Sequence, residues 1–160
     1  MIQLIRIDDR LLHGQVIYSW KASLDYQAIV IADDVAAADE LRKKVIKLAT
    51  PPGVKSITLS IEEACKFLQT ETLQNVKIFV VVASPKAAYE ILQCTGQKCS
   101  VNLGGMMKTG ARKEFAKAVY LENTDLEYLE KIEAMKLEVD VRQTPGESQQ
   151  NFQSLKSKFK

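Results

Sequence analysis

The chain has 160 residues, of which 46% are hydrophobic and 26% are charged. This length fits one domain that buries one sizeable core, and the composition excludes disorder and fibrous repeats as the main description. Lys plus Arg number 22 and Asp plus Glu number 20, a formal net charge of +2. Total charge therefore predicts neither nucleic acid nor a membrane surface as a partner, and any electrostatic partner has to meet a local patch.

The N-terminal segment and the apolar runs argue against membrane insertion. The longest apolar stretches, such as residues 78–83, are strand-sized and fall well short of the roughly 18 residues that a membrane span needs. Arg6, Asp8 and Asp9 stand where a signal peptide would need its apolar stretch. We therefore expect a cytoplasmic protein.

The cysteines do not form a recognisable pattern. Cys65, Cys94 and Cys99 are an odd number, and none stands in a CxxC pair. Neither a disulfide framework nor a zinc site is favoured, so we expect buried or idle thiols.

Strand-like apolar runs alternate with helix-patterned stretches along most of the chain. This alternation predicts a three-layer α/β/α fold, with a mostly parallel central sheet of about six to seven strands flanked by helices. The expected strands are residues 2–7, 27–32, 54–59, 76–83, 100–103, 118–121 and 137–141. The expected helices are residues 16–22, 36–49 and 125–135, with two more capped by Ser60 and Ser84. Tyr18, Trp20 and the Leu and Ile stripes, including Leu41, Val45 and Leu48, are assigned to the core.

The composition changes near the C-terminus. From Gln143 the chain is polar, with Phe152, Leu155 and Phe159 at near-helical spacing. We expect residues 143–160 to form a loop and a helix docked on a single domain that spans residues 1–160.

In an open parallel sheet the ligand site lies beyond the carboxyl ends of the strands. That rule selects a short set of polar loops that could converge on one pocket. They contain Asp8, Asp9, Arg10 and His13 after the first strand, Asp33 and Asp34 after the second, Ser84 after the strand at 76–83, and Asn102, Gly104 and Gly105 in and after the strand at 100–103.

His13 is the only histidine in the chain and precedes Gly14 in one of these loops. A lone histidine is more often structural, but a neutral imidazole is a competent nucleophile near pH 7. Arg10 and backbone N–H groups at a helix start would hold the oxygens of an incoming phosphoryl group, and Gly14 would let the backbone approach it closely. This combination favours phosphoryl transfer over the structural interpretation.

Asp8 and Asp9 allow two interpretations. One of them orients the His13 ring or Arg10, or the two form a metal-binding pair as in receiver domains. A receiver domain needs an Asp at the end of the third strand and a Lys at the end of the fifth. This chain has Leu59 and Ser60 at the first of these places and Val101 and Asn102 at the second. We therefore predict no metal site and leave the choice between Asp8 and Asp9 open.

The segment after the two glycines is basic. Gly104 and Gly105 form neither GxGxxG nor a P-loop, so they more simply shape a turn. Lys108, Arg112 and Lys113 follow, either as a solvated face or as a docking surface for an acidic or phosphorylated partner. Met106 and Met107 fill gaps or face that partner.

The stretch RIDDRLLHGQV at residues 6–16 resembles the IIB components of the mannose, fructose and sorbose class of the bacterial phosphotransferase system. Further matches are Trp20, the pair Asp33 and Asp34, NLGGM at residues 102–106 and QTP at residues 143–145. The resemblance covers nearly the whole chain.

The resemblance implies a phosphocarrier. His13 would accept a phosphoryl group, through Nδ1, from a phosphohistidine of the IIA component and pass it to a sugar bound by the membrane components IIC and IID. Arg10 matches the phosphate-contacting arginine, Asp9 the neighbouring acidic position, and residues 102–105 the loop that faces His13. With these, Gly14, Ser84 and Lys108 are our candidates for binding phosphate or the partner.

The expected protein is thus a histidine phosphotransferase without metal or organic cofactor. It would lie in the cytoplasm, associated with the inner membrane face through the permease, without a nucleic-acid partner, and a homo-oligomer is compatible with the sequence. The alternative is a non-catalytic regulatory or binding module on the same fold.

Overall fold

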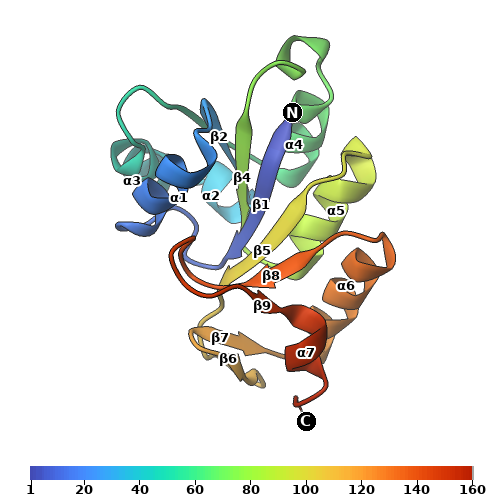
Figure 1. Ribbon diagram of the computed structural model, residues 1–160. Coiled ribbons are helices and arrows are strands. Elements are labelled where there is room, and N and C mark those ends of the chain that lie inside the picture. Colours follow the sequence, from blue (N-terminus) through green and yellow to red (C-terminus); the bar gives the residue numbers. More distant parts are fainter. Residues whose placement is uncertain (160) are drawn as a thin grey trace.

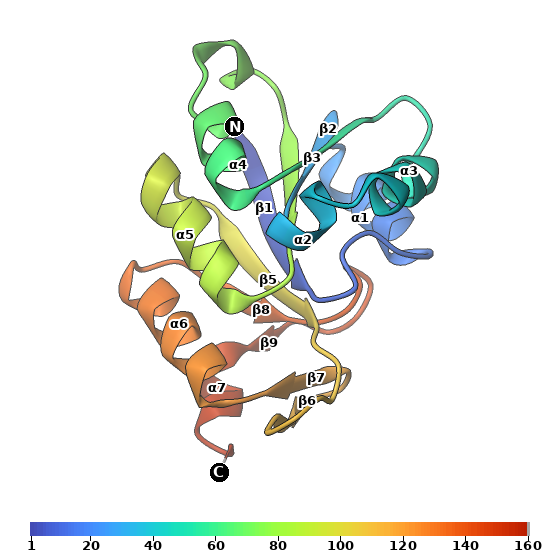
Figure 2. The same cartoon turned by 180° about the vertical axis from the view of Figure 1, so that it is seen from behind.

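A computed structural model describes residues 1–159 and confirms the predicted α/β/α architecture (Figures 1 and 2). Within that range the central sheet has seven strands in the order β3-β2-β4-β1-β5-β8-β9. Neighbouring strands are parallel except β8 and β9, which are antiparallel. The strands are β1 (Ile2–Asp8), β2 (Ala28–Ala32), β3 (Lys55–Leu59), β4 (Ile78–Val82), β5 (Ser100–Gly105), β8 (Val139–Val141) and β9 (Gln150–Asn151).

Helices cover both faces of this sheet. Helices α1 to α3 pack on one face, and α4 to α7 pack on the other (Figures 1 and 2). The helices are α1 (Val16–Leu24), α2 (Asp34–Ala37), α3 (Glu40–Ala49), α4 (Ile61–Leu68), the 3₁₀ turn η1 (Glu71–Leu73), α5 (Pro85–Thr95), α6 (Asn123–Ala134) and α7 (Phe152–Lys156).

The period of two along β4 explains how one strand serves two cores. Phe79 and Val81 point into the core under α1 to α3, whereas Val80 and Val82 point into the core under α4 to α7. All five residues of β4 are buried, as expected for a central parallel strand covered on both faces. β1 lies next to β4 and β5, so its carboxyl end is at the middle of the sheet edge.

The strand predicted at residues 118–121 lies outside the central sheet, which corrects the expected series. It forms β7 (Val119–Leu121), which pairs antiparallel with β6 (Lys113–Ala116), a strand that the sequence analysis missed. A parallel neighbour needs a crossover of a dozen or more residues, usually a helix. Residues 106–118, all described, contain no helix, and the segment folds back as a hairpin instead.

The helix predicted at residues 36–49 is two helices, and its apolar stripe is exposed. Asp39 separates α2 from α3 because its side chain accepts a hydrogen bond from Arg42 N and caps α3. Leu41, Val45 and Leu48 face solvent, which corrects their assignment to the core. Tyr18 is also exposed, while Trp20 is buried as predicted.

The expectation of idle thiols is wrong for two of the three cysteines. Cys65 on α4 and Cys94 on α5 form a disulfide with a Cα–Cα distance of 5.9 Å. Their 29-residue separation carries no pairing signal in the sequence; the pair forms because α4 and α5 pack side by side. Cys99 is free, and burial raises the pKa of its thiol to about 12, so this thiol stays protonated at neutral pH.

Among residues 1–159, no helix is both long and apolar enough to cross a membrane.

Candidate active site

Asp8, the last residue of β1, is the centre of a buried charge network. Arg6 and Asp8 are two residues apart on one strand, so their side chains project to the same face. Arg6 Nη2 donates to Asp8 Oδ2 at 2.9 Å, and both residues are almost fully buried. His13 Nε2 lies 2.9 Å from the same oxygen, and Arg10 N donates to Asp8 Oδ1 at 3.0 Å. Asp8 therefore joins the buried end of the network to the histidine loop.

Arg6 extends this network across the sheet. Its Nη1 donates to Asn102 Oδ1 at 2.7 Å on the neighbouring strand β5, and to the carbonyl of Gln143 at 2.8 Å. Burial lowers the pKa of the Arg6 guanidinium, and the adjacent Asp8 carboxylate opposes that effect. A buried charge needs an opposite charge and hydrogen-bond acceptors, and Arg6 has Asp8 as its partner and three hydrogen bonds in all. The sequence analysis missed Arg6, although a single charge inside the apolar stretch 2–7 was the available signal.

The two glycines predicted at the site make room for these charges. A Cβ on Gly104 would overlap the Arg6 guanidinium, and a Cβ on Gly105 would lie 3.2 Å from Asp8 Oδ1. The glycines are thus required by close packing on β5, rather than by a turn.

The loop that carries His13 has an unusual backbone. Leu11 is buried yet has a positive φ of 59°, a conformation that costs a non-glycine residue about 1 kcal/mol or more. Its N–H donates to the Asp8 carbonyl at 2.9 Å. Gly14 also has a positive φ, 53°, which glycine adopts readily. This backbone leaves the His13 side chain 26% exposed, so the ring is anchored but accessible.

Asp9 lies in a different environment from Asp8. Its Oδ2 accepts hydrogen bonds from Met107 N and Arg112 Nη1, each at 2.9 Å, and Arg112 Nη1 also donates to the Met107 carbonyl. Of the two aspartates, Asp8 contacts the His13 ring, and Asp9 ties the loop to residues 107–112. Arg112, which the sequence analysis placed on a solvated face or a docking surface, is instead mostly buried in this contact.

Arg10 and Lys108 line the same small cavity. Its volume is about 290 Å³, and it lies where the loop after β1 meets the end of β5. Arg10 is partly exposed, with its Nε 3.8 Å from Asp8 Oδ1. The other lining residues are Gly105, Met106, Met107, Ala118, Tyr120 and Gln143.

A C-terminal loop closes the site from the other side. Trp20 Nε1 donates to the Gln143 carbonyl at 3.1 Å, the same oxygen that Arg6 reaches. The Arg142 guanidinium lies 5.5 Å from the centre of the Trp20 ring, in the range of a cation–π contact. Glu147 accepts hydrogen bonds from Gln143 N and Thr144 N, which holds the loop in its turn.

Three predicted polar residues cap helices or loops instead of joining the network. The Ser84 hydroxyl accepts from Ala87 N and caps α5. Asp33 caps α2, and Asp34 Oδ1 accepts from Ile61 N. The loops after β1 and β5 therefore meet at the carboxyl edge of the sheet. The polar residues after β2 and β4 instead form hydrogen bonds with the helices that begin beside them.

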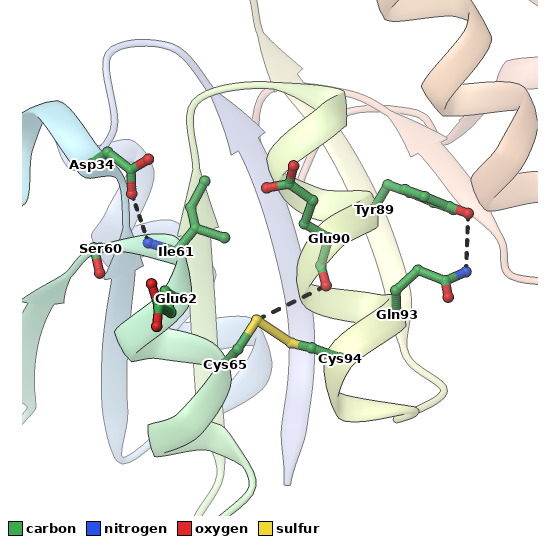
Figure 3. A pocket seen from close by; sticks show the side chains of 9 residues that line it. All are labelled: Asp34, Ser60, Ile61, Glu62, Cys65, Tyr89, Glu90, Gln93 and Cys94. Carbon is green, nitrogen blue, oxygen red and sulfur yellow. Dashed lines mark hydrogen bonds between the residues drawn. A yellow bond between two sulfur atoms is a disulfide. The ribbon is translucent and has the colours of Figure 1, made fainter.

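A larger, open groove lies between α4 and α5, on the other face of the sheet from α1 (Figure 3). Its volume is about 800 Å³, and it contains the disulfide and Tyr89, whose hydroxyl accepts from Gln93 Nε2 at 3.1 Å. Its charged side chains, Asp34, Glu62 and Glu90, are all acidic, which suits phosphate poorly. In the described part of the chain, no cluster of three or more His, Cys, Asp and Glu side chains could hold a metal ion. The buried network at Asp8 is therefore the stronger candidate.

Comparisons with known proteins agree with this geometry. The sequence model of the family described as "PTS system sorbose subfamily IIB component" matches residues 2–160. The sorbose-specific EIIB component of Klebsiella pneumoniae is 31% identical over 141 residues, which cover 88% of this chain and 86% of that protein. The mannose-specific EIIAB component of Escherichia coli K12 is 27% identical over 159 residues, 99% of this chain but 49% of that protein. This chain thus spans about half the length of the mannose relative.

Solved structures are similar over nearly the whole chain. The crystal structure of the IIBSor domain of the sorbose permease from Klebsiella pneumoniae has a TM-score of 0.95 and 28% identity, covering 100% of this chain and 98% of that chain. The N-acetylgalactosamine-specific IIB component 1 from Escherichia coli has a TM-score of 0.87 and 26% identity, covering 94% of this chain and 99% of that one.

Proposed function

The chain belongs to the family of PTS sorbose subfamily IIB components, and from this premise we propose that it is a phosphocarrier in which His13 carries the phosphoryl group. In this proposal, the group arrives from a phosphohistidine of a IIA component and leaves to a sugar bound by the IIC and IID membrane components. The protein would work in the cytoplasm, held at the inner membrane face through that permease. The half-length match to a mannose EIIAB component supports a IIA partner.

The observation that carries this proposal is the contact between His13 Nε2 and Asp8 Oδ2 at 2.9 Å. An ionised carboxylate can only accept a hydrogen bond, so Nε2 is the donor and carries the hydrogen, and Nδ1 keeps its lone pair. Asp8 is itself held by Arg6 and by Arg10 N, which fixes the orientation of the ring. Nδ1 is then the nucleophile.

Transfer proceeds by two in-line displacements. In the first, a bond forms between His13 Nδ1 and phosphorus while the P–N bond to the donor histidine breaks. In the second, the sugar hydroxyl oxygen attacks phosphorus and its proton passes to solvent, while the bond to Nδ1 breaks and returns its electron pair to Nδ1 as a lone pair. Arg10, Lys108 and the N–H groups of the loop with Gly14 would stabilise the charge on the equatorial oxygens, since phosphoryl transfer depends mostly on positioning and electrostatics.

The test is phosphorylation from phosphoenolpyruvate with the two general phosphotransferase proteins and a mannose-class IIA. We expect acid-labile, alkali-stable phosphate on His13, and none on the His13→Ala variant, whose fold should be unchanged because the ring is partly exposed. Peptide mapping and circular dichroism check the two expectations. Phosphate retained on the variant would contradict the proposal. Transfer of phosphate from the protein to sugar in reconstituted membranes tests the second step.

A further inference from the structure

Helix α3 presents an apolar stripe to solvent, made of Leu41, Val45 and Leu48. Their exposed fractions are 73%, 56% and 86%. The residues follow one another at intervals of four and three, so they share one helix face. The opposite face packs on the protein through Ile46, which is 4% exposed. A single exposed apolar side chain is ordinary, but three on one face of a ten-residue helix indicate an interaction surface.

The α3 stripe is set among positive charges. The helix carries four basic residues and one acidic residue, Glu40, a net charge of +3 over ten residues of a chain whose total is +2. Lys43 pairs with Glu40 at 3.5 Å, whereas Lys44 and Lys47 form no ion pair within residues 1–159. Lys44 lies three residues after Leu41 and four before Leu48, so it stands on the stripe's own face.

We propose that the α3 stripe docks on an anionic lipid surface, with its apolar side chains in the headgroup boundary and Lys44 and Lys47 against lipid phosphates. Helices that lie in a membrane interface combine an apolar face with Lys or Arg beside it. Lysines bury their aliphatic stems along such a face and keep their ammonium groups at the headgroups. A protein partner fits this surface less well, because lysine is depleted from the cores of protein interfaces.

The position of α3 in the fold suits this role. It lies in the same layer as α1, away from the helices on the other face (Figures 1 and 2). α1 begins three residues after His13, so lipid docking through α3 would keep the His13 loop near the bilayer. The proposal does not depend on the phosphocarrier reaction, because it rests on α3 alone.

Sedimentation with lipid vesicles tests the proposal. We expect the full chain to bind vesicles of equal parts phosphatidylcholine and phosphatidylglycerol, to bind pure phosphatidylcholine much more weakly, and to dissociate as salt is raised. The double variants Leu41→Gln with Leu48→Gln and Lys44→Gln with Lys47→Gln should each lower the lipid partition coefficient about tenfold or more. All four side chains are exposed, so circular dichroism should show an unchanged fold.

The matched control is Lys66→Gln with Lys86→Gln, two exposed lysines on α4 and α5 on the other face of the sheet. It removes the same charge and should bind anionic vesicles like the unchanged chain. Equal loss in the control, equal binding by the α3 variants, or no binding by the unchanged chain would each overturn the proposal. Sedimentation velocity completes the test: self-association abolished only by the α3 variants, without vesicle binding, would assign the stripe to a second copy instead.

Discussion

Asp8 and Asp9 are neighbours in the sequence with opposite structural roles, which a matched pair of variants can separate. In Asp8→Asn, buried Arg6 loses its carboxylate partner, which should cost about 3 kcal/mol of unfolding free energy. The new amide can donate to His13 Nε2 and hold the tautomer that protonates Nδ1, so we expect phosphoryl transfer to fall about 100-fold or more.

Asp9→Asn serves as the control for that change. It weakens the contact with Arg112 and Met107 but leaves the His13 ring contact in place, so a loss of about 1 kcal/mol and near-normal transfer are expected. Urea unfolding and the rate of His13 phosphorylation check both variants. If Asp9→Asn were the slower of the two in phosphorylation, the assignment of the orienting role to Asp8 would be wrong.

Gly104 and Gly105 give a second matched pair. An added methyl group at Gly104 overlaps the Arg6 guanidinium, which three hydrogen bonds hold in place, so Gly104→Ala should destabilise the protein by about 3 kcal/mol. At Gly105 the methyl group meets Asp8 at 3.2 Å, and about 1 kcal/mol is expected. Chemical denaturation measures both values, and equal losses would contradict the packing argument.

At the scale of elements, the disulfide between α4 and α5 closes a long loop. With a separation of 29 residues, the constraint on the unfolded chain should contribute about 3.5 kcal/mol. We expect a reductant to lower the unfolding free energy by that amount while the rate of His13 phosphorylation stays constant, because α4 and α5 cover the other face of the sheet from α1. The double variant Cys65→Ser with Cys94→Ser should no longer lose stability when reductant is added, whereas Cys99→Ser should still lose it. Any other pattern would argue against this disulfide as the source of the lost stability.

The elements that were predicted correctly are those whose local pattern determines their environment. The apolar run of β4 is long enough to require burial on both faces, and Ser60 and Ser84 cap the helices that follow them. β7 and the Cys65–Cys94 pair depend on which elements lie side by side, which no local pattern contains. The prediction that the α3 stripe lies in the core was wrong. Helical spacing identified the helix, but it does not show whether the apolar face points to the core or to solvent.

The sequence also indicated only part of the candidate site. His13, Arg10 and the two glycines follow from the rule that ligands bind at the carboxyl edge of a parallel sheet. Arg6 was missed because that rule selects residues beyond the strand ends, and Arg6 lies inside β1. The choice of Asp8 over Asp9 requires coordinates, because adjacent residues at the end of an extended strand point to opposite sides.

At the scale of the whole molecule, the site connects segments that are distant in the chain. Arg6 on β1 binds Asn102 on β5 and the Gln143 carbonyl, and Trp20 on α1 donates to the same carbonyl. Asp9 binds Met107 and Arg112 beyond β5. The framework around His13 is therefore already assembled and buried before any phosphate arrives, whereas Arg10 and the ring remain partly exposed.

This division predicts where phosphorylation changes the molecule. A phosphoryl group on His13 adds nearly two negative charges to the loop that carries Arg10, and Arg10 lines one cavity with Lys108. We therefore expect these side chains and the loop N–H groups to become ordered while the buried network stays as it is. Hydrogen exchange should slow at residues 9–15 and 105–110 and stay unchanged in α4 and α5. The His13→Ala variant in the same reaction mixture is the control. Slower exchange spread across α4 and α5 would instead mean that phosphate acts on the whole sheet, because a contact confined to two loops cannot protect helices on its far face.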